Sequence, residues 1–282
     1  MMVPEEISMI VSSDPSTGAI NRSSDGSYFE IQLQDGLNIP KEAHNINLSV
    51  EEASIWWTVP NIITGQNDKI YISGINTLDV LTDYVITIPQ GLYDLSGLNQ
   101  AILRGLENAG AKVNPNPLIT LTADEPTQKV EIRYNYGSVL IDFTKTDTPR
   151  AILGFNSAIY GPYTAGTNLL APNVAQFNQI NYFLIHSDLT TKGIRFNNKY
   201  NQTISQVLID VSPGSQIVSR PFNPARIPVP ELGGARRTNF RMWLTDDEDR
   251  SVNTSGEYWT ARIVIRYLRP FLIGNPDIRY KD

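Results

Sequence analysis

Hydrophobic and polar positions alternate with a period of two along most of this chain, the pattern of β-strands that bury one face. The exception lies between Asp83 and Gly110. There Asp94 can cap a helix, and Gly110 stands where a helix end favours positive φ. The apolar residues between them fall on one face: Leu95, Leu98, Ile102, Leu103 and Leu106. A single amphipathic helix needs a partner, so we expect it to lie across a sheet.

About ten or eleven strands are predicted from the alternation. In the segment 28–33 the apolar odd positions are expected to face inward and the even positions, Glu30 among them, outward; a loop is expected at Asp35-Gly36. Near the end, two alternating runs flank an acidic turn and predict a hairpin, with arms at 240–244 and 259–267. The other expected strands are 69–75, 83–88, 118–122, 130–136, 139–143, 180–185 and 206–211.

One long strand changes parity. Its apolar positions are even from Ile46 to Val50 and odd from Ala53 to Trp57, with Glu51-Glu52 between them. A β-bulge at the two glutamates would keep both halves facing one core. The alternative is a straight strand with buried carboxylates, and we favour the bulge.

The remaining segments indicate how the chain is divided into an arm, a core domain, an insertion and a tail. We treat 1–282 as a single domain in which residues 1–12 form an N-terminal arm or first strand. Residues 156–178 lack periodicity and are expected to be a surface loop or part of an insertion, which we place at 89–178. The residues after Leu268 leave the sheet as a tail, 268–282. Together these features indicate an all-β protein, an antiparallel β-sandwich with one crossing helix and a hairpin insertion.

Composition narrows the function classes. The 282 residues carry a net charge of −6, which argues against a nucleic-acid binder, and the chain has no cysteine. The N-terminus lacks the basic start of a signal peptide. Neither histidine, His44 or His186, has a metal-ligand or catalytic neighbour in the sequence, and the run Asp246–Asp249 does not complete a calcium loop. We therefore expect no enzyme activity, no cofactor and no small-molecule substrate.

The candidate interaction residues are cationic and apolar. The segment 220–241 holds five arginines against Glu231 and contains four prolines, which predicts an extended, stiff, cationic arm. Such arginines either satisfy groups of their own chain or meet an anionic partner surface. Adding two apolar residues of the tail gives the interface candidates Arg220, Arg226, Arg236, Arg237, Phe271 and Leu272.

Several runs together resemble a known family. They are a strand that ends in Pro60-Asn61, the run Tyr84-Val-Ile-Thr-Ile-Pro-Gln-Gly-Leu-Tyr93 leading into the helix, the turn Leu153-Gly154-Phe155, and the ending LTDDEDRSVNTSGEYWTARIVIRY. This succession, over most of 8–268, is similar to the penton or minor capsid proteins of tailless icosahedral double-stranded DNA viruses, the Polinton, virophage and adenovirus-like lineage.

The resemblance implies a jelly roll and a structural role in the virion, with assembly in the host cell. It implies a homopentamer that closes a vertex beside the major capsid protein, with a spike protein or an internal membrane as further partners. One alternative is a trimeric double jelly-roll major capsid protein, whose partner would be a homotrimer. Another is a carbohydrate-binding β-sandwich module whose platform would use Trp56, Trp57, Trp243 or Trp259. Of these, Trp57 and Trp259 fall on the predicted core faces.

Overall fold

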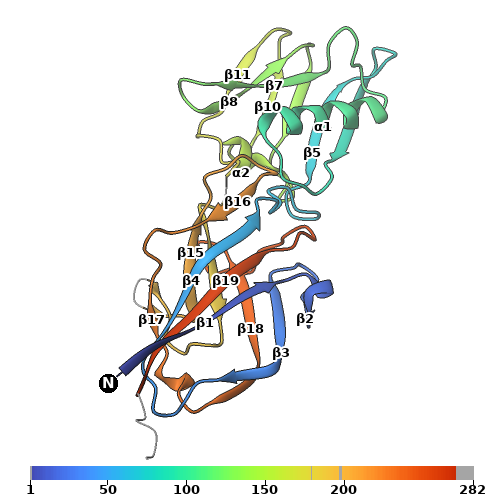
Figure 1. Ribbon diagram of the computed structural model, residues 1–282. Coiled ribbons are helices and arrows are strands. Elements are labelled where there is room, and N and C mark those ends of the chain that lie inside the picture. The colour runs from blue at the N-terminus through green and yellow to red at the C-terminus, as the bar shows by residue number, and fades with distance from the viewer. Residues whose placement is uncertain (1, 179, 197–198, 271–282) are drawn as a thin grey trace, which may run out of the picture. The chain divides into compact units, whose positions relative to one another are not determined.

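The structure is a computed structural model that describes residues 2–178, 180–196 and 199–270 (Figure 1). The chain forms two compact units. Unit 1 comprises residues 1–57 and 180–282, and unit 2 comprises residues 58–179. Unit 2 contains all of the predicted insertion, 89–178, and begins earlier, at Thr58.

The described part of unit 1 consists mainly of two antiparallel sheets. The first has the strand order β1-β19-β4-β16, with β17 also paired to β4, and the second has the order β15-β12-β18-β3-β2. A two-stranded ribbon, β13 and β14, and the 3₁₀ turns Pro15–Thr17 and Pro230–Leu232 complete it. The strands are β1 (Met2–Ser12), β2 (Ala19–Ile20), β3 (Tyr28–Asn38), β4 (His44–Trp56), β12 (Tyr182–Ser187), β13 (Arg195–Phe196), β14 (Lys199–Tyr200), β15 (Thr203–Leu208), β16 (Gln216–Ser219), β17 (Ile227–Pro228), β18 (Arg236–Thr245) and β19 (Thr260–Pro270).

This strand order is that of a jelly roll. Taking β1, β3, β4, β12, β15, β16, β18 and β19 as the first to eighth strands, one sheet reads 1-8-3-6 and the other 5-4-7-2. Successive strands therefore pass from sheet to sheet, except for the fourth and fifth, β12 and β15, which pair with each other, as in a double Greek key. The two inner faces pack together through large side chains. Trp57, just after β4, meets Phe183 of β12 edge to face at 5.9 Å, and Trp259 meets Phe29 of β3 at 4.9 Å. The all-β sandwich is confirmed.

The bulge in β4 is confirmed. Opposite β4, Arg262 pairs with Glu52 and Ile263 with Val50, so Glu51 is the extra residue. The apolar residues on both sides of it are buried, whereas Glu51 and Glu52 are half-exposed. Glu51 accepts from Arg266 and Glu52 from Arg220, so the alternative of two buried carboxylates is wrong.

The predicted terminal hairpin is wrong. Both runs are strands, and Phe240, Met242 and Leu244 are buried as expected, but β18 pairs with β3 and β12 whereas β19 pairs with β1 and β4. The 14-residue connection between them carries the chain from one sheet to the other. Alternation marks a strand with a buried face and does not name the strand that pairs with it.

Three further expectations fail locally. Glu30 is 9% exposed because Asn21 and Asn239 donate to its carboxylate, which satisfies it inside the protein. Asp35-Gly36 lies within β3, where Gly36 has φ +70° at a register shift against β18. Of the two alternatives for 156–178, the surface loop is wrong, because the stretch contains two strands, β10 and β11; it lies within unit 2, which agrees with the other alternative, part of an insertion.

In unit 2, helix α1 lies over the strands (Figure 1). The predicted helix is confirmed: it spans Leu95–Asn108, Asp94 caps it by accepting from the Gly97 N–H at 2.6 Å, and Gly110 has φ +76°. Its buried face packs against β6 and β7 and holds Leu98, Ala101, Ile102 and Leu106. The sheets have the orders β10-β9-β5-β6 and β11-β8-β7. The remaining elements are β5 (Lys69–Ile75), β6 (Leu81–Thr87), β7 (Ile119–Asp124), β8 (Lys129–Tyr134), β9 (Val139–Asp142), α2 (Arg150–Leu153), β10 (Ile159–Tyr163) and β11 (Asn168–Leu170). The predicted hairpin is β7–β8.

Candidate functional site

Three of the predicted interface residues lie toward the same end of unit 1. Arg226 directly precedes β17, which pairs with β4 at Asn47 and Leu48, near the start of that strand. Arg236 and Arg237 open β18 and pair with the last residues of β3, Asn38 and Leu37. Arg236 and Arg237 therefore lie beside the turn by which the chain passes from β3 to β4, and Arg226 lies beside the first half of β4. We call Arg226, Arg236 and Arg237 the arginine cluster.

The segment that carries the cluster is extended, as expected, and it is anchored to the rest of unit 1. Ile227, Val229 and Leu232 are buried, and β17 adds a short ladder to β4. The Glu231 carboxylate accepts from the Thr191 N–H at 2.9 Å, which fastens the segment to the loop after β12. The prolines hold the backbone extended, but apolar side chains between them reach the core, so the cationic side chains sit on a fixed support.

Arg220 stands apart from the cluster. It follows β16, opposite the middle of β4, and its guanidinium donates to Glu52 at 2.8 Å. This hydrogen bond lowers the pKa of Glu52. Arg220 thus pairs within its own chain, which was one of the two interpretations of the arginines.

The arginine cluster has no such partner among the described residues. No carboxylate of the described chain lies within ion-pair distance of Arg226, Arg236 or Arg237, and Arg226 and Arg236 are exposed. Arg226 also lines a groove of about 600 Å³ with apolar walls from Ile194, Ile227 and Pro228. Lys192 and Glu231 also line the groove, and Glu231 is engaged by the Thr191 N–H, so a partner with carboxylates and apolar side chains would suit its two cationic residues and its apolar walls.

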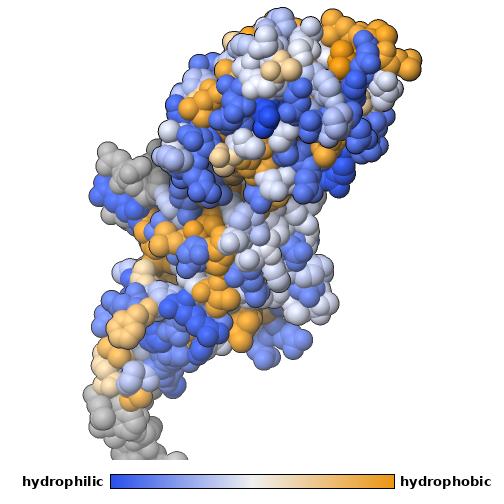
Figure 2. All heavy atoms as spheres, turned by 90° about the horizontal axis from the view of Figure 1, so that it is seen from above, coloured by the Kyte–Doolittle hydropathy of each residue, from blue (hydrophilic) through white to orange (hydrophobic). Residues whose placement is uncertain are grey.

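The most exposed apolar residue of the described chain stands between Arg220 and Arg226 in the sequence. Phe222 is fully accessible, flanked by Pro221 and Pro224. Elsewhere, unit 2 exposes Leu78, Val80 and Leu81 at the turn between β5 and β6. Figure 2 shows hydrophobic residues gathered in separate groups on a mostly hydrophilic surface. Contiguous exposed apolar groups on a folded chain mark contact sites.

The tail candidates Phe271 and Leu272 lie outside the described residues. The strand before them, β19, pairs with β1 up to Pro270 opposite Met2, and Leu268 pairs with His44 at the start of β4. The last described residue, Pro270, therefore lies at the end of unit 1 where β4 begins.

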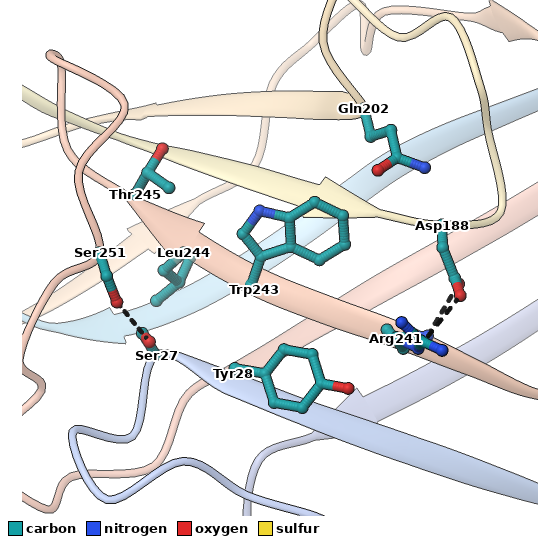
Figure 3. A pocket seen from close by; sticks show the side chains of 9 residues that line it. All are labelled: Ser27, Tyr28, Asp188, Gln202, Arg241, Trp243, Leu244, Thr245 and Ser251. Atoms are coloured by element: carbon teal, nitrogen blue, oxygen red, sulfur yellow. Dashed lines mark hydrogen bonds and ion pairs between the residues drawn. The ribbon is translucent and has the colours of Figure 1, made fainter.

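A pocket of about 470 Å³ lies on the outer face of the second sheet (Figure 3). The inner face of β18 buries Met242 and Leu244, so Arg241 and Trp243 project to the other side, where Tyr28 is the direct neighbour of Trp243 on β3. Beside them, Asp188 accepts from the Arg241 backbone N–H at 2.8 Å and lies 3.7 Å from the Arg241 Nε. The pocket is lined by Ser27, Tyr28, Asp188, Gln202, Arg241, Trp243, Leu244, Thr245 and Ser251.

The indole of Trp243 stacks on a buried histidine. Its ring lies parallel to the imidazole of His186, with an interplanar angle of 4° and centroids 5.3 Å apart. His186 is itself fixed, since Nε2 is 2.8 Å from the Thr245 hydroxyl and Nδ1 is 3.2 Å from the Thr203 hydroxyl. Burial lowers the pKa of His186 to about 4, and the nearby Asp249 only partly opposes this. The imidazole is therefore neutral near pH 7 and serves as a rigid backing for the indole.

The far wall of the pocket is also ordered. The hydroxyls of Ser27 and Ser251 are 2.9 Å apart, and both contact Asp25. Burial alone would raise the pKa of Asp25, but the hydrogen bonds from Ser23, Ser27 and Ser251 outweigh it and lower the pKa. At the upper wall, Gln202 donates its amide N–H to the Thr190 carbonyl, which leaves the amide oxygen on the side of Trp243 (Figure 3).

Sequence reasoning named Trp243 but missed the residues around it. Tyr28, Asp188 and Gln202 come from three distant segments and meet Trp243 through strand pairing, which the local pattern does not reveal. Of the other tryptophans, Trp57 and Trp259 are buried, as expected. Trp56 is half-exposed on β4, which belongs to the other sheet.

The described residues offer neither a metal site at the acidic run 246–249 nor a membrane-spanning helix. Asp246 is buried and accepts from Arg250 at 2.8 Å, and no group of three or more potential metal-ligand residues occurs in the described chain. Among the residues that the structure describes, no helix combines the length and apolar character needed to span a bilayer.

No protein-family model matches this chain, and no curated protein sequence matches it. Among solved structures, the chain is similar to the crystal structure of the selenomethionine-labelled mavirus penton protein, with a TM-score of 0.48 and 10% sequence identity. The superposition covers 93% of this chain and 99% of the mavirus chain. An identity this low transfers no residue role from one chain to the other.

Proposed function

We propose that this protein is a structural component of an icosahedral virion, and that five copies close the vertices of the shell. In this proposal residues 1–282 form a single jelly-roll capsid domain that carries unit 2 as an insertion. The protein works by packing against copies of itself and against a neighbouring major capsid protein, and no chemical step is involved. A spike protein or an internal membrane would be a further contact.

The observation that carries the proposal is the strand order of unit 1. The 1-8-3-6 and 5-4-7-2 sheets are those of the jelly roll, a fold used by viral capsid proteins and by lectins and cupins. Fold alone does not decide among these uses. The penton-like succession of sequence elements described above, from the strand before Asn61 to Trp259, favours the capsid.

The second unit favours a vertex protein over the trimeric alternative. A double jelly-roll protein requires a second set of eight strands in the same order. The described part of unit 2 instead has a four-stranded and a three-stranded sheet around α1. A single roll with an insertion agrees better with a pentamer than with the trimer of a double roll.

The surface of unit 1 supports self-association. The arginine cluster is set on a fixed support without a carboxylate partner in the described chain, and Phe222 is fully exposed nearby in the sequence. Burying such groups in a subunit interface would satisfy the charges and remove the apolar ring from water. An interface of this kind places cationic residues of one copy against carboxylates of a net acidic neighbour.

The solution mass of the assembled protein tests the proposal. Multi-angle light scattering at micromolar concentration should give about 158 kDa for five copies of the 31.5 kDa chain, against about 95 kDa for three copies. Mass spectrometry of purified particles should find the chain in the virion at a copy number far below that of the major capsid protein. A stable monomer that is also absent from virions would refute the structural role, and a trimer would refute the vertex assignment.

A further inference from the structure

The pocket around Trp243 has the features of a ligand site that capsid packing does not require. One face of the indole is covered by the His186 imidazole, and the ring lies in the wall of the 470 Å³ pocket (Figure 3). No described residue accepts a hydrogen bond from the Trp243 indole N–H. A flat apolar ring with a free polar atom at its edge is suited to a ligand with an apolar face and a polar rim.

The groups that ring the indole are planar hydrogen-bonding groups. Asp188 offers carboxylate oxygens, Arg241 a guanidinium, and Gln202 an amide oxygen that its own bond to Thr190 leaves available. Each can engage two adjacent donors or acceptors in one plane. Two hydroxyl groups on neighbouring ring carbons present that arrangement.

The charge of the lining excludes some ligand classes. Asp188 and Arg241 are the ionised side chains among the nine lining residues, and they are paired with each other, so their charges cancel. A phosphate or carboxylate ligand would meet Asp188 beside the arginine and gain little net attraction. The affinity of a neutral ligand does not depend on a net charge in the pocket, so this pairing does not weaken its binding.

The site is also ordered before any ligand arrives. Thr203 and Thr245 hold His186, His186 backs the indole, and the strand pairing of β3, β18 and β12 fixes the spacing of Tyr28, Trp243 and His186 in one row. A ligand would therefore not have to order these side chains on binding, which removes a common cost of association.

We propose that this pocket binds a neutral pyranose sugar. The C–H face of the sugar ring would lie on the indole of Trp243, and its equatorial hydroxyls would meet Asp188, Arg241 and Gln202. Because a monosaccharide has few atoms and the pocket is open, the dissociation constant should be on the order of 1 mM. In an assembly, several such sites would bind a surface that carries many glycans far more tightly.

Saturation-transfer difference NMR on the full chain tests the proposal. The probes are the methyl glycosides of glucose, galactose, mannose and N-acetylglucosamine, with N-acetylneuraminic acid and the nucleosides adenosine and uridine for comparison. At least one neutral glycoside should show transfer, strongest at the protons of one ring face. Absence of transfer for every neutral glycoside at 20 mM, or transfer confined to the acidic sugar or the nucleosides, would overturn the proposal.

Two pairs of variants locate the site. Trp243→Phe keeps a ring over His186 but reduces the platform, and it should weaken binding at least fivefold, whereas Trp56→Phe on the other sheet should leave binding unchanged. Arg241→Ala should also weaken binding, and Arg262→Ala, an exposed arginine of β19, should not. Thermal melting checks that each variant is folded. Equal binding by Trp243→Phe and Trp56→Phe in folded proteins would overturn the proposal, whatever the oligomeric state of the chain.

Discussion

His186 illustrates at the scale of one residue how a side chain can be located by sequence but not understood from it. In the sequence it follows the predicted strand 180–185 and has no metal-ligand or catalytic neighbour, and it lies near the end of β12. Its burial beneath Trp243 and its bonds to Thr203 and Thr245 depend on two other strands. Glu30 is similar, because the asparagines that donate to its carboxylate are distant in the sequence: Asn21 is 9 positions away and Asn239 is 209 positions away. Alternation predicts a face, and distant partners decide whether a polar group there can be buried.

The burial of His186 predicts a loss of stability in mild acid. Its folded pKa, about 4, lies below the ordinary value of 6.5, so the unfolded state takes up the proton first. The stabilisation is complete above pH 6.5 and is lost as the pH falls toward 4. Between pH 7.5 and pH 5 the His186 contribution to the free energy of unfolding should fall by about 2 kcal/mol. Urea titrations of wild type and His186→Asn at both pH values measure it as a difference.

A matched substitution separates His186 from the carboxylates that titrate in the same range. His44→Asn, at the exposed start of β4, should keep the pH dependence of the wild type. If His186→Asn and His44→Asn lost stability equally between the two pH values, the imidazole would not be buried in its neutral form.

At the scale of elements, the sequence predicted local structure well and pairing poorly. The helix, its cap at Asp94 and the bulge at Glu51 were all predictable, because each depends on neighbouring residues and one buried face. The pairing of β18 and β19 was not, since two adjacent alternating strands predict a hairpin by proximity in the chain. The jelly roll instead places them in opposite sheets. Nor could the local pattern show β10 and β11, which are short and half-exposed.

The helix gives a prediction about stability at this scale. Leu98 is fully buried against the core of unit 2, so Leu98→Ala should cost about 2–5 kcal/mol in the free energy of unfolding. Leu78→Ala is the matched control, because Leu78 is 80% exposed and the same atoms are removed from water rather than from a core. Denaturant titration measures both. A loss below about 0.5 kcal/mol for Leu98→Ala would mean that α1 does not cover the sheets.

At the scale of the whole molecule, the chain's division was only partly predictable. The insertion was expected at 89–178, and unit 2 starts at Thr58 because β5 and β6 already belong to the helix-covered sheets and not to the jelly roll. Composition does not change at that boundary. The arginines were identified from the sequence as a group, and the fold separates them: Arg220 is paired with Glu52, whereas Arg226, Arg236 and Arg237 lie toward the same end of unit 1.

This separation sharpens the last prediction, which concerns assembly. Replacing Arg236 and Arg237 together with alanine should impair oligomer formation, because their charges have no carboxylate partner in the described chain and are available to another subunit. The melting temperature of the protomer should change by no more than about 2 °C, since such charges contribute little to the fold. Light scattering across a protein concentration series measures assembly. The wild-type oligomer should also weaken as salt is raised, because screening reduces charge pairs at an interface rim.

The control is a double variant that replaces two arginines outside the cluster with alanine. Arg104→Ala with Arg133→Ala removes two exposed arginines of unit 2 and should leave assembly intact. If the Arg236 and Arg237 variant assembled as well as this control, the cluster would not be an interface. If instead it melted many degrees earlier as a protomer, the two arginines would be structural, since β18 begins with them and pairs there with the end of β3. A selective loss of assembly in a protomer of unchanged stability is the result that assigns the cluster to the contact between subunits.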